Sequence, residues 1–169
     1  MNAKNAMSLD EIETLAKELI DHHLKHSGWS FSFDRSKQRM GCTDFRTKTI
    51  SASKYLFSIP ENANENLVKD TILHEIAHAV VGQHHGHDRI WQSAAKVLGC
   101  DPIRCYQAEK VVAVKPNFRY TCPSCNYSFT RFRRSKKADN AACGICCKGK
   151  FNSEYKFIVT YENPKTTHK

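Results

Sequence analysis

The sequence contains no run of about 18 apolar residues, so it offers no segment that could cross a membrane as a helix. Residues 1–6 lack the apolar stretch of a secretory leader, and the chain has neither an internal repeat nor a low-complexity tract. With 40% hydrophobic and 25% charged residues, wholesale disorder is excluded. We therefore expect a cytoplasmic protein, with association with a nucleoid as an alternative and a nuclear location if the source is a eukaryote.

Acidic residues are scarce in the last third of the chain. Residues 110–169 contain 13 Lys and Arg residues against three acids, whereas residues 1–109 contain 13 against 14. The whole positive charge of +9 therefore belongs to the C-terminal part. This asymmetry indicates a polyanionic partner for that part, and a solvated basic surface without a partner is the alternative.

Eight cysteines are many for 169 residues, and without a secretory leader metal ligation is favoured over disulfides. Two C-x-x-C pairs, separated by 17 residues, have the spacing of a zinc ribbon: Cys122, Cys125, Cys143 and Cys146. Four thiolates would close the coordination shell, so this zinc would be structural. The remaining thiols are expected to be buried and free, with Cys147 beside the second pair as an alternative ligand: Cys42, Cys100, Cys105 and Cys147.

Apolar periodicity predicts three helices followed by an irregular segment. The helices are expected over residues 8–26, 67–81 and 88–98, the first with a Ser8–Glu11 capping box. Short extended stretches are expected over residues 29–33, 39–45 and 47–53.

The second predicted helix carries the motif His74-Glu75-Ile76-Ala77-His78. Residues four apart lie on one face of a helix, so both imidazoles can reach one metal ion. Glu75 lies beside them as a carboxylate that can take a proton from a zinc-activated water. The motif predicts a catalytic zinc with Glu75 as general base.

A catalytic zinc needs a third protein ligand and an open fourth position. The spacing H-E-x-x-H-x-x-G-x-x-H would select His84, but the required glycine is displaced by one position to Gly82. His87 follows Gly86 at the start of the third predicted helix, from where a side chain can turn back, and we favour it as the third ligand. His84 or His85 would then face solvent or substrate.

The segment between the two cysteine pairs is basic, with two interleaved aromatic residues, Phe129 and Phe132. Its cations can neutralise phosphates while aromatic rings stack on unpaired bases. We therefore expect DNA, single-stranded DNA included, to bind at Arg131, Arg133, Arg134, Lys136 and Lys137.

Taken together, these motifs resemble the SprT-like zinc metalloprotease family. The resemblance rests on residues 29–33, residues 50–53, Leu73 to Ala79, Gly86 to Trp91 and the trailing ribbon. It implies catalytic zinc on His74, His78 and His87 with Glu75 as general base. Eukaryotic members digest proteins crosslinked to DNA, which implies a protein substrate of that class.

The expected architecture is α+β: a zincin-like SprT domain over residues 1–108 with a small antiparallel sheet, a linker over 109–116, a β zinc ribbon over 117–162 and a tail over 163–169. The expected function is zinc-dependent peptide hydrolysis on DNA-bound or DNA-crosslinked proteins. A non-enzymatic nucleic-acid-binding zinc protein and a metallopeptidase without DNA dependence are the alternatives.

Overall fold

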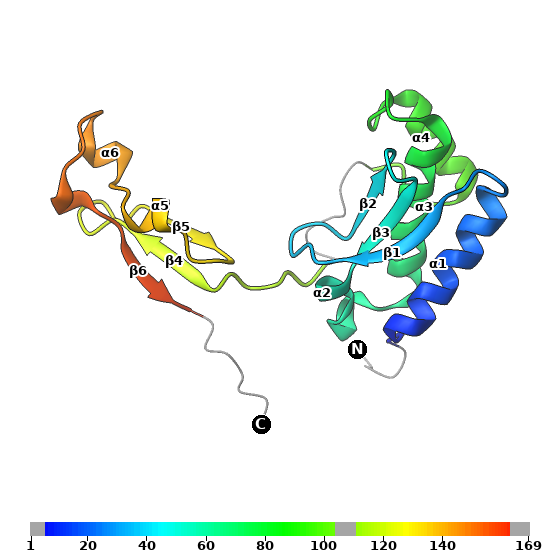
Figure 1. Cartoon of the computed structure of the whole chain (residues 1–169), viewed down its shortest axis with the longest axis horizontal. Helices are drawn as coiled ribbons and strands as arrows, with labels where there is room; N and C mark the ends of the chain where they lie inside the picture. Colours follow the sequence, from blue (N-terminus) through cyan, green and yellow to red (C-terminus); the bar gives the residue numbers. More distant parts are fainter. Residues whose placement is uncertain (1–5, 104–110, 163–169) are drawn as a thin grey trace. The chain divides into compact units, whose positions relative to one another are not determined.

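A computed structural model describes residues 6–103 and 111–162 (Figure 1). The chain forms two compact units, divided between Val114 and Lys115. Cys105, the tail 163–169 and part of the predicted linker lie outside the described residues. Within the described ranges, no helix is long and apolar enough to span a membrane.

The first unit places a three-stranded sheet against long helices (Figure 1). Its elements are α1 (Leu9–His23), β1 (Ser30–Asp34), β2 (Gly41–Asp44), β3 (Thr49–Ser53), α2 (Lys54–Phe57), the 3-10 turn η2 (Pro60–Asn62), α3 (Glu65–Val81) and α4 (Arg89–Leu98).

The strand order in this sheet is β1-β3-β2. The outer strand β1 runs parallel to the central strand β3, with Phe31 opposite Ile50, and β2 runs antiparallel to it, with Thr43 opposite Ile50. The sheet is therefore mixed, which corrects the expected antiparallel arrangement. The physical reason is that only β2 and β3 form a hairpin, whereas β1 pairs on the far side of β3 after a longer connection.

The core of the first unit lies between the sheet and helices α1 and α3. Ile12, Ile50, Val68, Ile72 and Ile76 are among its fully enclosed side chains. The buried residues of α1 and α3 recur at helical spacing, and the buried apolar residues of β3 lie at alternate positions, as burial of one face of each element requires.

Residues 111–114, part of the predicted linker, belong to the first unit. Val111 and Val114 pack against its core. Between them, the backbone N–H of Val112 donates to Oδ1 of the buried Asn62 at 2.8 Å, and Nδ2 of Asn62 donates to the carbonyl of Val112 at 2.8 Å. These paired bonds fix the segment to the first unit.

The second unit is a small sheet with short helical turns. Its strand order is β5-β4-β6, antiparallel throughout. The elements are β4 (Phe118–Thr121), β5 (Ser128–Arg131), α5 (Lys136–Asp139), α6 (Gly144–Cys147), the 3-10 turn η3 (Ser153–Tyr155) and β6 (Ile158–Tyr161).

The α+β class expected from the sequence is confirmed, as is the Ser8–Glu11 capping box at the start of α1. Helix α1 ends at His23, earlier than expected, with Leu24 as C-cap. Helix α3 begins two residues before the expected position because Asn64 caps it by accepting a hydrogen bond from the N–H of Leu67.

Candidate metal centre

Helix α3 supplies the first two histidines of the candidate centre. Its apolar face is buried, whereas His74 and His78 lie four residues apart and remain half-buried. The helix ends at Gly82, whose φ of +89° lies in a region that glycine adopts at little cost. The chain can therefore turn sharply after His78 and return along the same side.

The third histidine is His87, at the entry to α4. Asp88 is the N-cap of this helix: its Oδ1 accepts from the backbone N–H groups of Ile90 and Trp91, both at 3.0 Å. The side chain of Gln92 donates to the carbonyl of His87 at 3.1 Å. These contacts hold the backbone of His87 from both sides of the helix start.

His85 does not join the histidine cluster. Its Nδ1 lies 2.8 Å from Oδ2 of Asp88, so the two oxygens of Asp88 serve separately as helix cap and as partner of His85. The structure therefore places His87, and not His84 or His85, in the cluster with His74 and His78. Among the described residues, neither His84 nor His85 belongs to a metal-type group.

The three imidazoles converge through their Nε2 atoms. Nε2 of His87 lies 3.0 Å from that of His74 and 3.1 Å from that of His78. Tetrahedral zinc with bonds of about 2.1 Å would separate its nitrogen ligands by about 3.4 Å. The spacing and the three-nitrogen donor set therefore fit one zinc ion with one position left open to substrate.

His74 and His78 are held in the neutral form that binds metal. Burial, followed by the nearby His78, lowers the pKa of His74 to about 3. Burial, followed by His87, lowers the pKa of His78 to about 4. Neutral imidazoles offer a lone pair at neutral pH, so a metal ion would displace no proton from either ring.

The indole ring of Trp91 packs against the imidazole rings of all three histidines. Its ring is fully buried and its centroid lies 4.6 Å from that of His74, 5.2 Å from that of His78 and 4.4 Å from that of His87. These ring contacts restrict the orientation of each imidazole.

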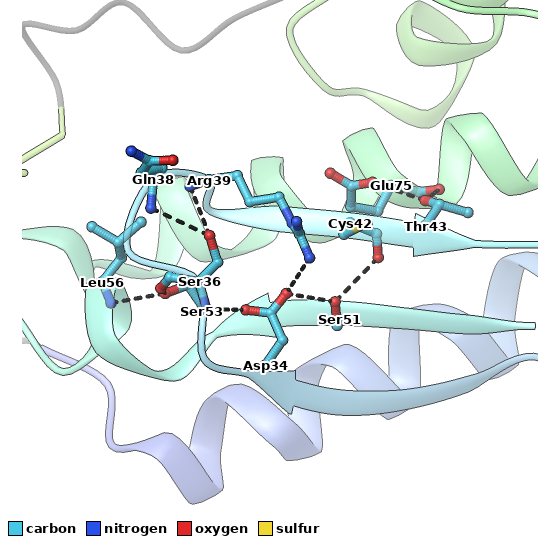
Figure 2. Close-up of polar contacts among 10 residues, drawn as sticks. All are labelled: Asp34, Ser36, Gln38, Arg39, Cys42, Thr43, Ser51, Ser53, Leu56 and Glu75. Atoms are coloured by element: carbon cyan, nitrogen blue, oxygen red, sulfur yellow. Dashed lines mark hydrogen bonds and ion pairs between the residues drawn. The ribbon is translucent and has the colours of Figure 1, made fainter. Parts of the chain in front are cut away.

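Glu75, the residue between the two helix ligands, is buried against strand β2 (Figure 2). Only 8% of it is exposed, and burial raises the pKa of its carboxyl group to about 7. Thr43 on β2 donates to its Oε2 at 2.8 Å, which opposes this rise. A carboxyl group with a pKa near 7 is suited to exchange protons at neutral pH.

The four ribbon cysteines form a second metal-type cluster. Sγ of Cys122 lies 3.8 Å from that of Cys146, and Sγ of Cys125 lies 3.7 Å from that of Cys143. Zinc–sulfur bonds of about 2.3 Å in a tetrahedron separate the sulfurs by about 3.8 Å. The cluster therefore fits a closed four-thiolate zinc site, to which Cys147 contributes no ligand atom.

The basic residues between the cysteine pairs differ in what they contact. Arg134 is paired with Asp139 at 2.9 Å, and the guanidinium of Arg131 lies 5.4 Å from the centroid of the Phe129 ring. In the part of the chain that the structure describes, no ion pair involves the exposed cations Arg133, Lys136 and Lys137.

The fold and the first cluster define an α+β protein with a metal-type centre built on two helices and a buried carboxylate beside it. The SprT-like family model matches residues 9–111, more than half of the chain. The chain therefore belongs to the SprT-like family. The match ends before the ribbon, so the four-cysteine unit lies outside the family domain.

Two curated relatives carry the same family name. "Protein SprT" of Pseudomonas syringae pv. tomato is 28% identical over 125 residues, which cover 68% of this chain and 74% of that protein. "Protein SprT" of Pseudomonas savastanoi pv. phaseolicola is 27% identical over the same shares. No solved structure matches the chain significantly.

Sequence reasoning missed two residues of this site. Trp91 was part of the motif that carries the resemblance, and its position four residues after His87 is a usable signal for a shared face. Thr43 lies 32 residues before Glu75 in the sequence, and no local pattern links them.

Proposed function

We propose that this protein is a zinc-dependent endopeptidase of the SprT-like type that acts on DNA-bound or DNA-crosslinked proteins. The observation that carries the proposal is the convergence of three imidazoles on one point, with a buried carboxyl group on the residue that follows His74. A site that holds zinc only for structure has no need of a proton-accepting residue at the position of Glu75.

Each residue of the centre has a role in this proposal. His74, His78 and His87 hold the ion, and Asp88 and Trp91 fix the third ligand and the ring planes. Zinc in such a site supplies Lewis acidity, which lowers the pKa of a water molecule and polarises a carbonyl group. Glu75 takes the proton from the attacking water and delivers it to the nitrogen of the leaving amine.

DNA is the proposed partner of the second unit. Residues 110–169 carry a net charge of +10, and the exposed side chains of Arg133, Lys136 and Lys137 are available to phosphates. Four thiolates holding one zinc ion would contribute about −2 and reduce this excess only in part. Because the catalytic and basic elements belong to one chain, binding to DNA would raise the concentration of DNA-bound proteins near the centre.

The test is cleavage of a DNA-binding test protein, and of the enzyme itself, with and without single-stranded DNA. Glu75→Gln is the central control because it keeps the size of the side chain and removes the base. The zinc content of both proteins is measured, so that a loss of activity is not a loss of metal.

Cleavage that requires DNA and falls by at least about 10²-fold in Glu75→Gln supports the proposal. Cleavage that DNA does not affect leaves a metallopeptidase whose ribbon has another partner. Equal inactivity of zinc-loaded wild type and Glu75→Gln on every substrate argues for a non-enzymatic nucleic-acid-binding protein.

A further inference from the structure

Strand β2 presents two residues to Glu75. Gly41 and Thr43 are two positions apart, so they lie on the same face of the strand, and both contact the Glu75 side chain. Cys42 between them lies opposite Ser51 of β3 and therefore faces the other side. The face of β2 that carries Gly41 and Thr43 therefore packs against the side chain of Glu75.

The hydroxyl group of Thr43 reaches two acceptors on Glu75. Its Oγ1 lies 2.8 Å from Oε2 of the carboxyl group and 2.8 Å from the backbone carbonyl of the same residue (Figure 2). A threonine hydroxyl has one proton to donate, so the two oxygens share it. The contact joins the end of the Glu75 side chain to its own backbone and ties helix α3 to β2.

Gly41 leaves space for the other oxygen of the carboxyl group, because it has no side chain. A Cβ atom at this position would lie 2.8 Å from both Cγ and Oε1 of Glu75, closer than real Cβ contacts allow. Any side chain at residue 41 would push Glu75 out of its place. The carboxyl group is therefore held at Oε2 by the hydroxyl group of Thr43, and Oε1 lies in the space that a side chain at residue 41 would fill.

Among the described strands β2 pairs with β3 alone, and a polar network adds a second anchor for it. Oδ2 of Asp34, at the end of β1, accepts from Arg39 at 2.9 Å and from Ser51 of β3 at 3.0 Å (Figure 2). Arg39 lies two residues before β2. The network fixes the start of β2 relative to β1 and β3, so the strand can act as a rigid support for Glu75.

We propose that Thr43 is a positioning residue that holds the Glu75 carboxyl group in the orientation for proton transfer, an inference that rests on the proposed function. In this role Thr43 acts only through Glu75, by its hydrogen bond to the carboxyl group. Loss of its hydroxyl group misplaces the base, and a misplacement of about 1 Å costs about 10²-fold in rate.

The test compares Thr43→Val, which removes the hydroxyl group at constant shape, with Thr43→Ser, which keeps it. Thr49→Val on β3 is the matched control, because its hydroxyl group contacts Thr47 and Ser30 instead of the centre. We expect kcat of Thr43→Val to fall about 10- to 100-fold, with KM and zinc affinity unchanged and only the modest fall in thermal midpoint that a lost hydrogen bond causes. Thr43→Ser and Thr49→Val retain the wild-type kcat.

A second measurement avoids catalysis altogether. In the metal-free chain labelled with ¹³C-glutamate, the Glu75 Cδ resonance is assigned by its absence in Glu75→Gln. We expect this resonance to move in Thr43→Val, to stay in place in Thr43→Ser and to be unaffected by Thr49→Val.

Two outcomes would overturn the inference. In the first, Thr43→Val keeps the wild-type kcat and Cδ resonance although Glu75→Gln is inactive, so that the proposed function stands without it. In the second, both Thr43 variants lose zinc affinity and thermal stability together with kcat, which marks a structural role. Full activity of Glu75→Gln would instead refute the proposed function. The Cδ resonance would then test only whether Thr43 holds the carboxyl group of Glu75.

Discussion

The two metal-type clusters of this chain are built in opposite ways. In the described part of the first unit, 19 buried hydrophobic residues form a core that exists without the histidines. In the described part of the second unit, the buried residues are Tyr120, Cys122, Ala138 and Cys143, and two of these four are candidate zinc ligands. We therefore expect the first unit to fold without a metal ion and the second unit to need one in order to fold.

The difference extends to the chemistry of the ligands. A zinc ion on the three histidines would have one coordination position open, and the buried carboxyl group of Glu75 follows His74 directly, as the proposed turnover requires. In the cysteine cluster, four sulfur atoms lie at a spacing that fits tetrahedral zinc, and an ion held by all four would have no position for a substrate. An open site must be held in shape by the protein, and a closed site can be held in shape by its ion.

The largest expected effect is on the second unit when zinc is removed. A strong chelator, or Cys143→Ser, should unfold residues 115–162 and leave the first unit folded, because structural zinc contributes on the order of 10 kcal/mol to small domains. In a ¹H–¹⁵N spectrum, the resonances of the second unit should collapse to random-coil positions while those of the first unit stay dispersed.

The matched control is Cys147→Ser, which removes the adjacent thiol outside the cluster. This variant should retain a folded second unit and its zinc. A second unit that stays folded after complete removal of metal would contradict the comparison, because its small core would then suffice.

A smaller effect is expected from the buried carboxyl group of the first unit. Glu75 has a folded-state pKa of about 7, raised above its unfolded value by burial. Its contribution to stability is therefore complete below the unfolded pKa and is lost as the pH rises through about 7. Metal-free Glu75→Gln should be more stable than the wild type by about 1 to 3 kcal/mol at pH 8 and of equal stability near pH 4.

Fluorescence reports this difference for the first unit alone, because both tryptophans of the chain, Trp29 and Trp91, belong to it. The lowered pKa values of the histidines affect both proteins alike and cancel in the comparison. Glu18→Gln, at an exposed position of α1, is the control and should change nothing. Equal stability of Glu75→Gln and wild type at pH 8 would show that burial of the carboxylate has no cost.

The sequence predicted local features well. The cap at Asp88, the place of His87 in the histidine cluster and the helix that carries Glu75 follow from spacing within about 15 residues. What it could not predict depends on contacts between distant segments. Alternation identifies residues 29–33 as a strand but carries no information on its neighbour, so the parallel pairing of β1 with β3 was missed. The Thr43–Glu75 contact depends on the same non-local packing.

The smallest expected effect distinguishes two neighbouring arginines of the basic second unit. Arg134 is held by Asp139, which also accepts from the hydroxyl group of Tyr120 at 3.0 Å, whereas Arg133 is exposed and outside the described ion pairs. Each phosphate contact with single-stranded DNA contributes about 0.7 to the slope of log K against log salt. Arg133→Gln should therefore lower the slope by about 0.7, and Arg134→Gln should leave it nearly unchanged.

The measurement is a titration of fluorescent single-stranded DNA at several salt concentrations, with the thermal midpoint of each variant checked. Equal slopes for the two variants would show that the net charge of the unit, and not the freedom of individual side chains, determines binding.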